Sequence, residues 1–297
     1  VESETFVGLK NLRILSLSQN DLRCLPEDLL YRMPALEQLL LGGKRDERGK
    51  QIVRGNYLDG VLPSDLLKHS PCLKGLDLSE NQLESLPATM FAKQPLLQSV
   101  DLGNNHLSEL PPEVFAGLSS LQSLDLRYNR LSELPPEVFA GLSSLQSLYL
   151  MGGRLGELPP EVFAGLFAGL SSLQSLYLSS NSLSELPPEV FAGLSSLKSL
   201  DLGNNRLSEL PPEVFAGLFA GLSSLQSLDL RYNRLSELPP EVFAGLSSLQ
   251  SLDLRGNGLS ELPPEVFAGL SSLQTLNLCL CRAQQLAVAR PEGQPSQ

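Results

Sequence analysis

The sequence contains no tryptophan, only two histidines and only four cysteines among its 297 residues. So few histidines and cysteines give little support to a zinc site, and we expect no metal and no cofactor. A Gly-rich phosphate loop is also missing, as is any His, Cys and Asp cluster in which a base could activate a nucleophile. We therefore expect no catalytic residues and no enzymatic activity.

Long apolar runs and an excess of positive charge are missing as well. No run approaches the roughly 18 apolar residues that a bilayer-spanning helix needs. The formal net charge is -11, and seven copies of the segment ELPPE supply fourteen of the 33 acidic residues. A negative charge spread in this way disfavours nucleic acid and anionic membranes as partners. We expect neither a nucleic-acid partner nor direct contact with a membrane.

A repeated unit occupies most of the chain. The pattern L-x-x-L-x-L-x-x-N-x-L begins eleven times, most often at intervals of 24 residues. Within a unit, the alternation L-x-L predicts a short strand with leucines on the inner face and variable residues on the outer face. The paired prolines of ELPPE exclude a helix at that point and turn the chain back. The units begin at Leu12, Leu36, Leu73, Leu97, Leu121, Leu145, Leu173, Leu197, Leu225, Leu249 and Leu273.

The ninth position of the unit is usually asparagine. A buried amide must bond backbone groups, and stacked asparagines would do so from one coil to the next. All eleven phenylalanines fall in one slot of the unit or in its short duplications, which predicts an aromatic spine on the outer side of the coils. The predicted asparagine ladder consists of Asn81, Asn105, Asn129, Asn181, Asn205, Asn233 and Asn257.

These units resemble the 24-residue typical subclass of leucine-rich repeat proteins, as found in Toll-like receptors and variable lymphocyte receptors. The resemblance implies an α/β solenoid: a right-handed horseshoe with a concave parallel β-sheet and a mostly irregular convex side. It also implies function by binding, and it favours an extracellular or cell-surface location over a cytoplasmic one. Extracellular members usually carry cysteine-rich caps, whereas this chain has only Cys24, Cys72, Cys279 and Cys281. Cys281 occupies the asparagine slot of the last unit.

The near-identical units differ mainly at their fifth, seventh and eighth positions, which we expect on the concave side. The serines of LSSLQS hardly change although they are expected to be exposed too, so exposure alone does not explain the variation. Exposed aromatic residues and arginines mark binding sites, and four of the six tyrosines lie at these positions. We therefore predict a protein or peptide ligand on the concave face. The predicted ligand-binding residues are Asp125, Arg127, Tyr128, Tyr149, Met151, Tyr177, Asp229, Arg231, Tyr232 and Arg255.

Two alternatives to a recognition module remain open. The varied positions could drift without constraint, and each Asp and Arg pair could be a weak local ion pair. The chain could then be a structural repeat array, or an engineered consensus scaffold, with no selected ligand. Exposed leucines at the ends of the array could also favour end-to-end or homodimeric self-association.

Insertions interrupt the regular spacing at three places. The second unit is 37 residues long because of a basic segment at 44–55, which would either be mobile or contact a ligand. Two units of 28 residues repeat FAGL at 163–170 and 215–222, where four extra residues would add about one helical turn. The duplicated FAGL suggests a recently expanded tandem array or a design. We place one domain at 1–286 and a disordered tail at 287–297.

Overall fold

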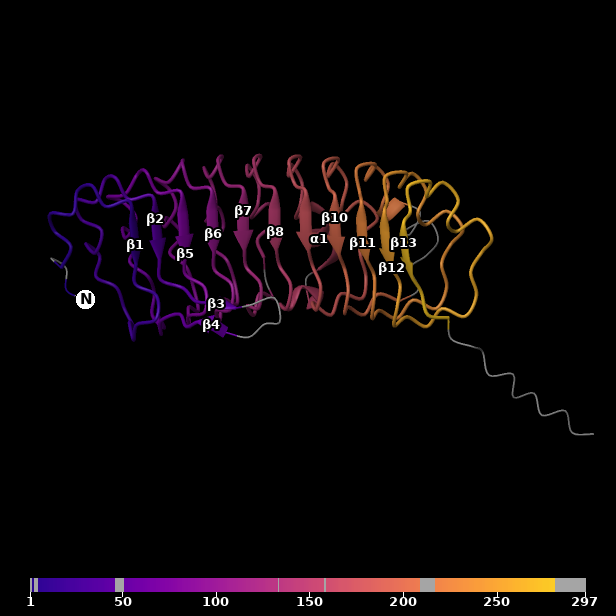
Figure 1. Ribbon diagram of the computed structural model, residues 1–297, viewed down its shortest axis with the longest axis horizontal. Helices are drawn as coiled ribbons and strands as arrows, with labels where there is room; N and C mark the ends of the chain where they lie inside the picture. Colours follow the sequence, from indigo (N-terminus) through magenta and orange to yellow (C-terminus); the bar gives the residue numbers. More distant parts are fainter. Residues whose placement is uncertain are drawn as a thin grey trace, which may run out of the picture.

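The computed structural model describes residue 2 and residues 5–45, 51–132, 134–157, 159–208 and 217–280. It shows an elongated solenoid in which successive coils lie side by side along the long axis (Figure 1). Each 24-residue unit forms one coil with one short strand, as the sequence predicts. The predicted tail and Cys281 lie outside the described residues.

The strands form one parallel sheet that lines the concave side. All eleven pair only with their neighbours, in the order β1-β2-β5-β6-β7-β8-β9-β10-β11-β12-β13. The fifth positions of adjacent units stand in register along the sheet, as Asp125 does with Tyr149. The strands are β1 (Ile14–Ser16), β2 (Gln38–Leu40), β5 (Gly75–Asp77), β6 (Ser99–Asp101), β7 (Ser123–Asp125), β8 (Ser147–Tyr149), β9 (Ser175–Tyr177), β10 (Ser199–Asp201), β11 (Ser227–Asp229), β12 (Ser251–Asp253) and β13 (Thr275–Asn277).

One continuous core of leucine, valine and phenylalanine side chains fills the solenoid. Phenylalanine rings stack from coil to coil on the convex side, for example Phe115 on Phe139 at 6.3 Å between centroids. The first FAGL duplication changes this spine, because Phe167 rather than Phe163 stacks on Phe191. Phe163 packs edge-to-face against Phe167 instead.

Asparagines at the ninth position form a ladder of hydrogen bonds between coils. Asn129 is typical: its Nδ2 donates to the Leu126 carbonyl in its own coil and to the Leu102 carbonyl of the preceding coil, both at 3.0 Å. Its Oδ1 accepts the Leu107 N–H at 3.0 Å. The bonds therefore tie each coil to its neighbour while satisfying a buried amide. The pattern recurs at Asn81, Asn105, Asn181, Asn205, Asn233 and Asn257.

Asn56 is a further ladder residue that the sequence analysis missed. The long insertion separates it from the rest of its unit, yet it donates to the carbonyls of Leu17 and Leu41 at 2.9 and 2.8 Å. Its Oδ1 accepts the Leu22 N–H at 3.2 Å. The N-x-L pattern at 56–58 was the available signal. The insertion therefore leaves the coil and returns to it without disturbing the core.

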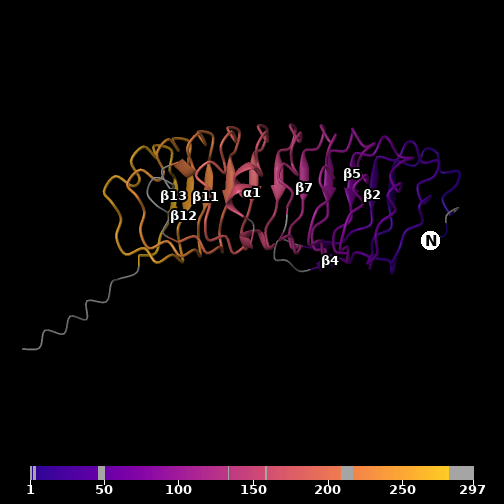
Figure 2. The same ribbon diagram turned by 180° about the vertical axis from the view of Figure 1, so that it is seen from behind.

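The insertion itself begins and ends as an antiparallel hairpin, β3 (Lys44–Arg45) with β4 (Gln51–Val53). It projects from one edge of the solenoid in both views (Figures 1 and 2). Arg54 contacts Asp21 at 3.0 Å, which anchors the returning chain. Strand pairing and this ion pair hold the described flanks of the insertion, and the mobility of the segment stays a prediction.

The convex side is mostly irregular. The 3-10 helix η1 (Leu155–Glu157) and α1 (Pro160–Gly165) lie in the unit with the first FAGL duplication, which confirms the predicted helical turn. The second duplication falls partly outside the described residues. No helix in the described part of the chain has the length and apolarity to cross a bilayer.

Candidate functional site

Two tyrosines form the centre of the concave sheet. Tyr149 ends β8 and Tyr177 ends β9, and parallel pairing places them directly beside each other. Their rings are stacked with centroids 4.7 Å apart and planes 4° from parallel. Both side chains are partly exposed because the fifth position faces away from the leucine core. The structure thus brings these two predicted site residues together in a face-to-face stack with two outer ring faces.

Arg127 and Asp125 flank the N-terminal side of this tyrosine pair. The Arg127 guanidinium carbon lies 5.2 Å from the Tyr149 ring centroid, in cation–π range. Arg127 also forms an ion pair with Asp125, whose Oδ1 accepts the Arg127 N–H at 3.0 Å. Asp125 is only 5% exposed. It was predicted to contact ligand, but its position makes it a support for Arg127 instead.

The predicted residues on the other side lie farther from the tyrosines. Asp229 and Arg231 belong to the unit of β11, and Arg255 to the unit of β12, with β10 between them and the tyrosine pair. The Arg231 Nε lies 3.0 Å from Asp229 Oδ2. Arg255 Nη2 lies 2.6 Å from Asp253 Oδ2, and the same Asp253 carboxylate accepts its Nε–H. Each arginine thus pairs with the aspartate two residues before it.

The aspartates of neighbouring strands form a column, and burial changes their ionisation. Burial, with the negative charge of Asp125 beside it, raises the pKa of Asp101 to about 7. Burial likewise raises the pKa of Asp125, against the opposing effect of Arg127. In contrast, the hydrogen bond from Arg255 lowers the pKa of Asp253. The Asp101 carboxyl, on β6, therefore gains or loses its proton near neutral pH.

The eighth position follows a different rule. It adopts a left-handed backbone in unit after unit, with φ of 52° at Tyr128 and 71° at Gly152. A Cβ on Gly152 would lie 2.3 Å from Tyr128 Cδ1, so the tyrosine ring covers the glycine of the next coil. Tyr232 and Gly256 repeat this arrangement at the same 2.3 Å. Packing between coils thus accounts for part of the sequence variation, although the two tyrosines remain 52% and 57% exposed.

The remaining predicted residue, Met151, lies in the turn after β8 and is partly exposed. Sequence reasoning missed two glycines at the seventh position, Gly103 and Gly203. Each faces the arginine of the next unit: a Cβ there would come within 3.2 Å of Arg127 Cγ or 3.3 Å of Arg231 Cγ. The signal was the recurrence of Gly followed by Arg at this position in two pairs of adjacent units.

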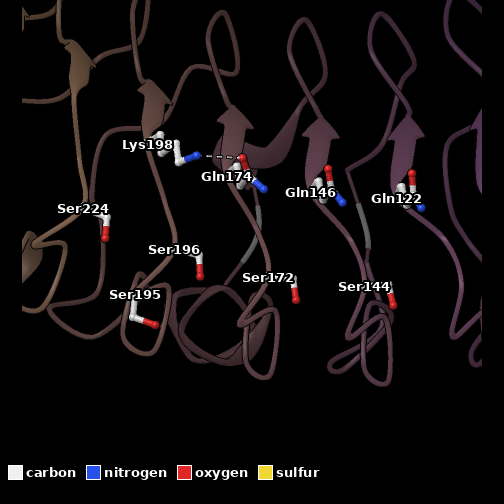
Figure 3. A pocket seen from close by; sticks show the side chains of 9 residues that line it. All are labelled: Gln122, Ser144, Gln146, Ser172, Gln174, Ser195, Ser196, Lys198 and Ser224. Atoms are coloured by element: carbon white, nitrogen blue, oxygen red, sulfur yellow. Dashed lines mark hydrogen bonds between the residues drawn. The ribbon is translucent and has the colours of Figure 1, made fainter.

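A polar groove of about 540 Å³ runs beside the tyrosine pair, at the start of the strands (Figure 3). Gln122, Gln146, Gln174 and Lys198 form one row, and serines form a second. Lys198 Nζ donates to Gln174 Oε1 at 3.2 Å. The groove therefore offers amides, hydroxyls and the amino group of Lys198. Across the described residues, no group of three or more His, Cys, Asp and Glu side chains is placed to hold a metal ion.

Several solved structures are similar to this chain. A chain of the Toll–Spatzle complex of Drosophila is 28% identical over 93% of this chain, with a TM-score of 0.74. The TLR13–ssRNA13 complex gives 30% identity over 94% of this chain, with a TM-score of 0.61. This chain covers 39% and 45% of those two chains, so it spans less than half of their lengths. A leucine-rich repeat protein of Leptospira interrogans gives 29% identity over 91% of this chain and 79% of that one, with a TM-score of 0.55.

No curated protein sequence matches the chain significantly. The leucine rich repeat family matches nearly all of the described sequence, at 1–45, 52–107, 95–155, 150–207, 171–220, 211–259 and 223–280. With the repeated strand, the asparagine ladder and the parallel sheet, this match identifies the chain as a member of the leucine-rich repeat family.

Proposed function

We propose that the concave sheet is a recognition surface for a protein or peptide, centred on Tyr149 and Tyr177. The observation that carries this proposal is their face-to-face stack, a partly exposed pair of parallel rings in the middle of the sheet. Tyrosine supplies a large, rigid contact area at low entropic cost and is enriched in binding sites. The paired arginines and aspartates around it form a charged rim.

Similar structures contain two kinds of partner, a protein in the Toll–Spatzle complex and RNA in the TLR13–ssRNA13 complex. The charge of this chain favours the first kind. Its net charge is -11, and the column of the concave sheet carries aspartates at six of the fifth positions. RNA phosphates would be repelled by that surface, because their binding depends on lysines and arginines that neutralise them. A protein or peptide ligand has no such requirement.

A peptide-display selection against the whole chain tests this proposal. Binders from a random library are expected to lose about tenfold or more in affinity for the Y149S/Y177S double variant, because tyrosine anchors dominate such contacts. Y31S is the matched control, since Tyr31 is an exposed tyrosine near the N-terminus, far from the pair in sequence, and packs on His69. A selection whose binders hold the double variant as tightly as the wild type contradicts the proposal and supports a scaffold without a concave ligand site.

A further inference from the structure

The tyrosine stack has two outer ring faces, and they have different neighbours. The outer face of Tyr149 is covered by Arg127, whose guanidinium Asp125 holds in place. On the opposite side, the only ring or cation contact of Tyr177 among the described residues is the stack with Tyr149. Its neighbour in register is Asp201, on β10. The second face thus has a carboxylate beside it and no cation of its own.

Asp201 differs from three other aspartates of the column. Asp125, Asp229 and Asp253 each form an ion pair with an arginine two residues later. At the corresponding place after Asp201 stands Gly203, and the Asp201 Oδ1 accepts the Gly203 N–H at 2.9 Å. In the described part of the chain, no cationic side chain forms an ion pair with Asp201. The carboxylate is partly exposed, so it is accessible from the concave side.

Gly203 has no side chain that could cover Asp201, although its surroundings are narrow. A Cβ on Gly203 would lie 3.2 Å from Asp201 Oδ1 and 3.3 Å from both Arg231 Cγ and Asp229 Oδ1. The guanidinium of Arg231 is directed to Asp229 on the next strand, so it does not fill the place over Asp201. An aromatic face and an accessible carboxylate therefore meet between β9 and β10.

We propose that Tyr177 and Asp201 form a subsite for an arginine or lysine side chain from a basic segment of a protein partner. The incoming cation would stack on the free face of Tyr177 and pair with Asp201, in the arrangement that Arg127, Asp125 and Tyr149 already form within the chain. Charge complementarity supports this occupant. Six fifth-position aspartates face three seventh-position arginines, at 127, 231 and 255, so the column has three more carboxylates than guanidinium groups.

The inference rests on the proposed function and narrows it to basic partners. Its test uses a fluorescein-labelled heptapeptide of alternating serine and arginine, with a glutamine-for-arginine version as the uncharged probe. Saturable binding of the arginine peptide is expected below about 1 mM, with little binding of the glutamine peptide. D201N is expected to weaken binding about fivefold, because it removes the ion pair while its side-chain oxygen still accepts the Gly203 N–H. E237Q removes one exposed acid elsewhere and should change affinity less than twofold.

G203R is the sharper variant, because it supplies the missing cation from within the chain. Arg231 and Arg255 already stand on adjacent coils, which shows that neighbouring arginines are accommodated at the seventh position. G203R is expected to block the peptide about tenfold or more by occupying the subsite. G103R is its matched control, made in the same Gly-then-Arg setting next to Arg127 but away from Tyr177. Unfolding curves of both variants establish that they are folded.

The outcomes separate the two proposals. Equal weakening by D201N and E237Q, equal blocking by G203R and G103R, or no saturable arginine-peptide binding overturns the cation subsite. If display-selected peptides still depend on Tyr149 and Tyr177, the concave recognition site survives that result. If neither the selected peptides nor the arginine peptide depends on the tyrosines, both proposals fail.

Discussion

At the scale of single residues, the eighth position shows why otherwise similar units have different residues. The backbone there is left-handed, which favours glycine and asparagine over tyrosine. Tyrosine nevertheless stands at 128 and 232, and in both cases the following unit has glycine. The ring of each tyrosine lies over that glycine, so the residue chosen in one coil restricts the residue allowed in the next.

The pairing of Tyr128 with Gly152 can be measured as a coupling between adjacent coils. G152A is expected to lower the free energy of unfolding by about 1–3 kcal/mol, because the new methyl would contact the Tyr128 ring and alanine is strained at positive φ. In the Y128N background the loss should fall to about 1 kcal/mol, the backbone cost alone. Urea unfolding of the four proteins gives the coupling, and the Tyr232 and Gly256 copy should reproduce it. Equal losses in both backgrounds would show that the ring does not constrain the glycine.

The sequence predicted which residues fill the core and the ladder, because their period of 24 is visible without coordinates. It also placed Tyr149 and Tyr177 on the same side of the sheet, since both hold the fifth position of their units. It did not predict that Asp125 is buried beneath Arg127, because burial of a polar residue depends on its neighbours in the next coils. The roles of Gly103 and Gly203 were missed for the same reason, because each glycine lies against the arginine of the next unit.

At the scale of strands, the aspartate column makes stability depend on pH. Asp101 has a folded-state pKa of about 7, raised from 3.8 by burial and by Asp125 on β7. The folded state therefore binds a proton more tightly than the unfolded state does. Its contribution to stability is complete below pH 3.8 and is lost as the pH rises through 7.

Replacing Asp101 by asparagine keeps the neutral form at every pH. D101N is expected to match the wild type near pH 4 and to exceed its free energy of unfolding by about 1–3 kcal/mol at pH 8. Denaturant unfolding at several pH values checks this. D253N should act in the opposite direction, because Arg255 lowers the pKa of Asp253 and its contribution is present above pH 3.8 and lost as the pH falls. A D101N difference that stays constant with pH would contradict a raised pKa of Asp101.

At the scale of the whole molecule, the coil that contains Gly153 interrupts both the asparagine ladder and the phenylalanine stack. Gly153 occupies the asparagine slot, so the Leu126 carbonyl accepts from Asn129 alone, whereas the Leu102 carbonyl accepts from two asparagines. The phenylalanine stack also stops at Phe139 and resumes at Phe167, with no ring contact between them among the described residues. On the concave side, the tyrosine stack joins this coil to the next. The candidate site therefore includes a coil in which, among the described residues, both the asparagine ladder and the phenylalanine stack are interrupted.

Filling the empty rung should strengthen this junction. G153N is expected to raise the free energy of unfolding by about 1–2 kcal/mol, because its amide would donate to the carbonyls of the flanking coils. The new Cβ would lie 2.9 Å from Asn181 Oδ1, so the Asn181 side chain must shift to admit it. The backbone already has the arrangement of a ladder asparagine, because the Gly153 N–H bonds Asn181 Oδ1 at 3.1 Å as the Asn181 N–H bonds Asn205 Oδ1 at 3.0 Å. G153A adds the Cβ without the amide and should give no gain. If this coil opens separately from its neighbours, hydrogen exchange at the Gly153 and Leu155 amides should be slower in G153N than in the wild type. Unchanged exchange and an unchanged free energy of unfolding would show that the solenoid already unfolds as one unit through this coil.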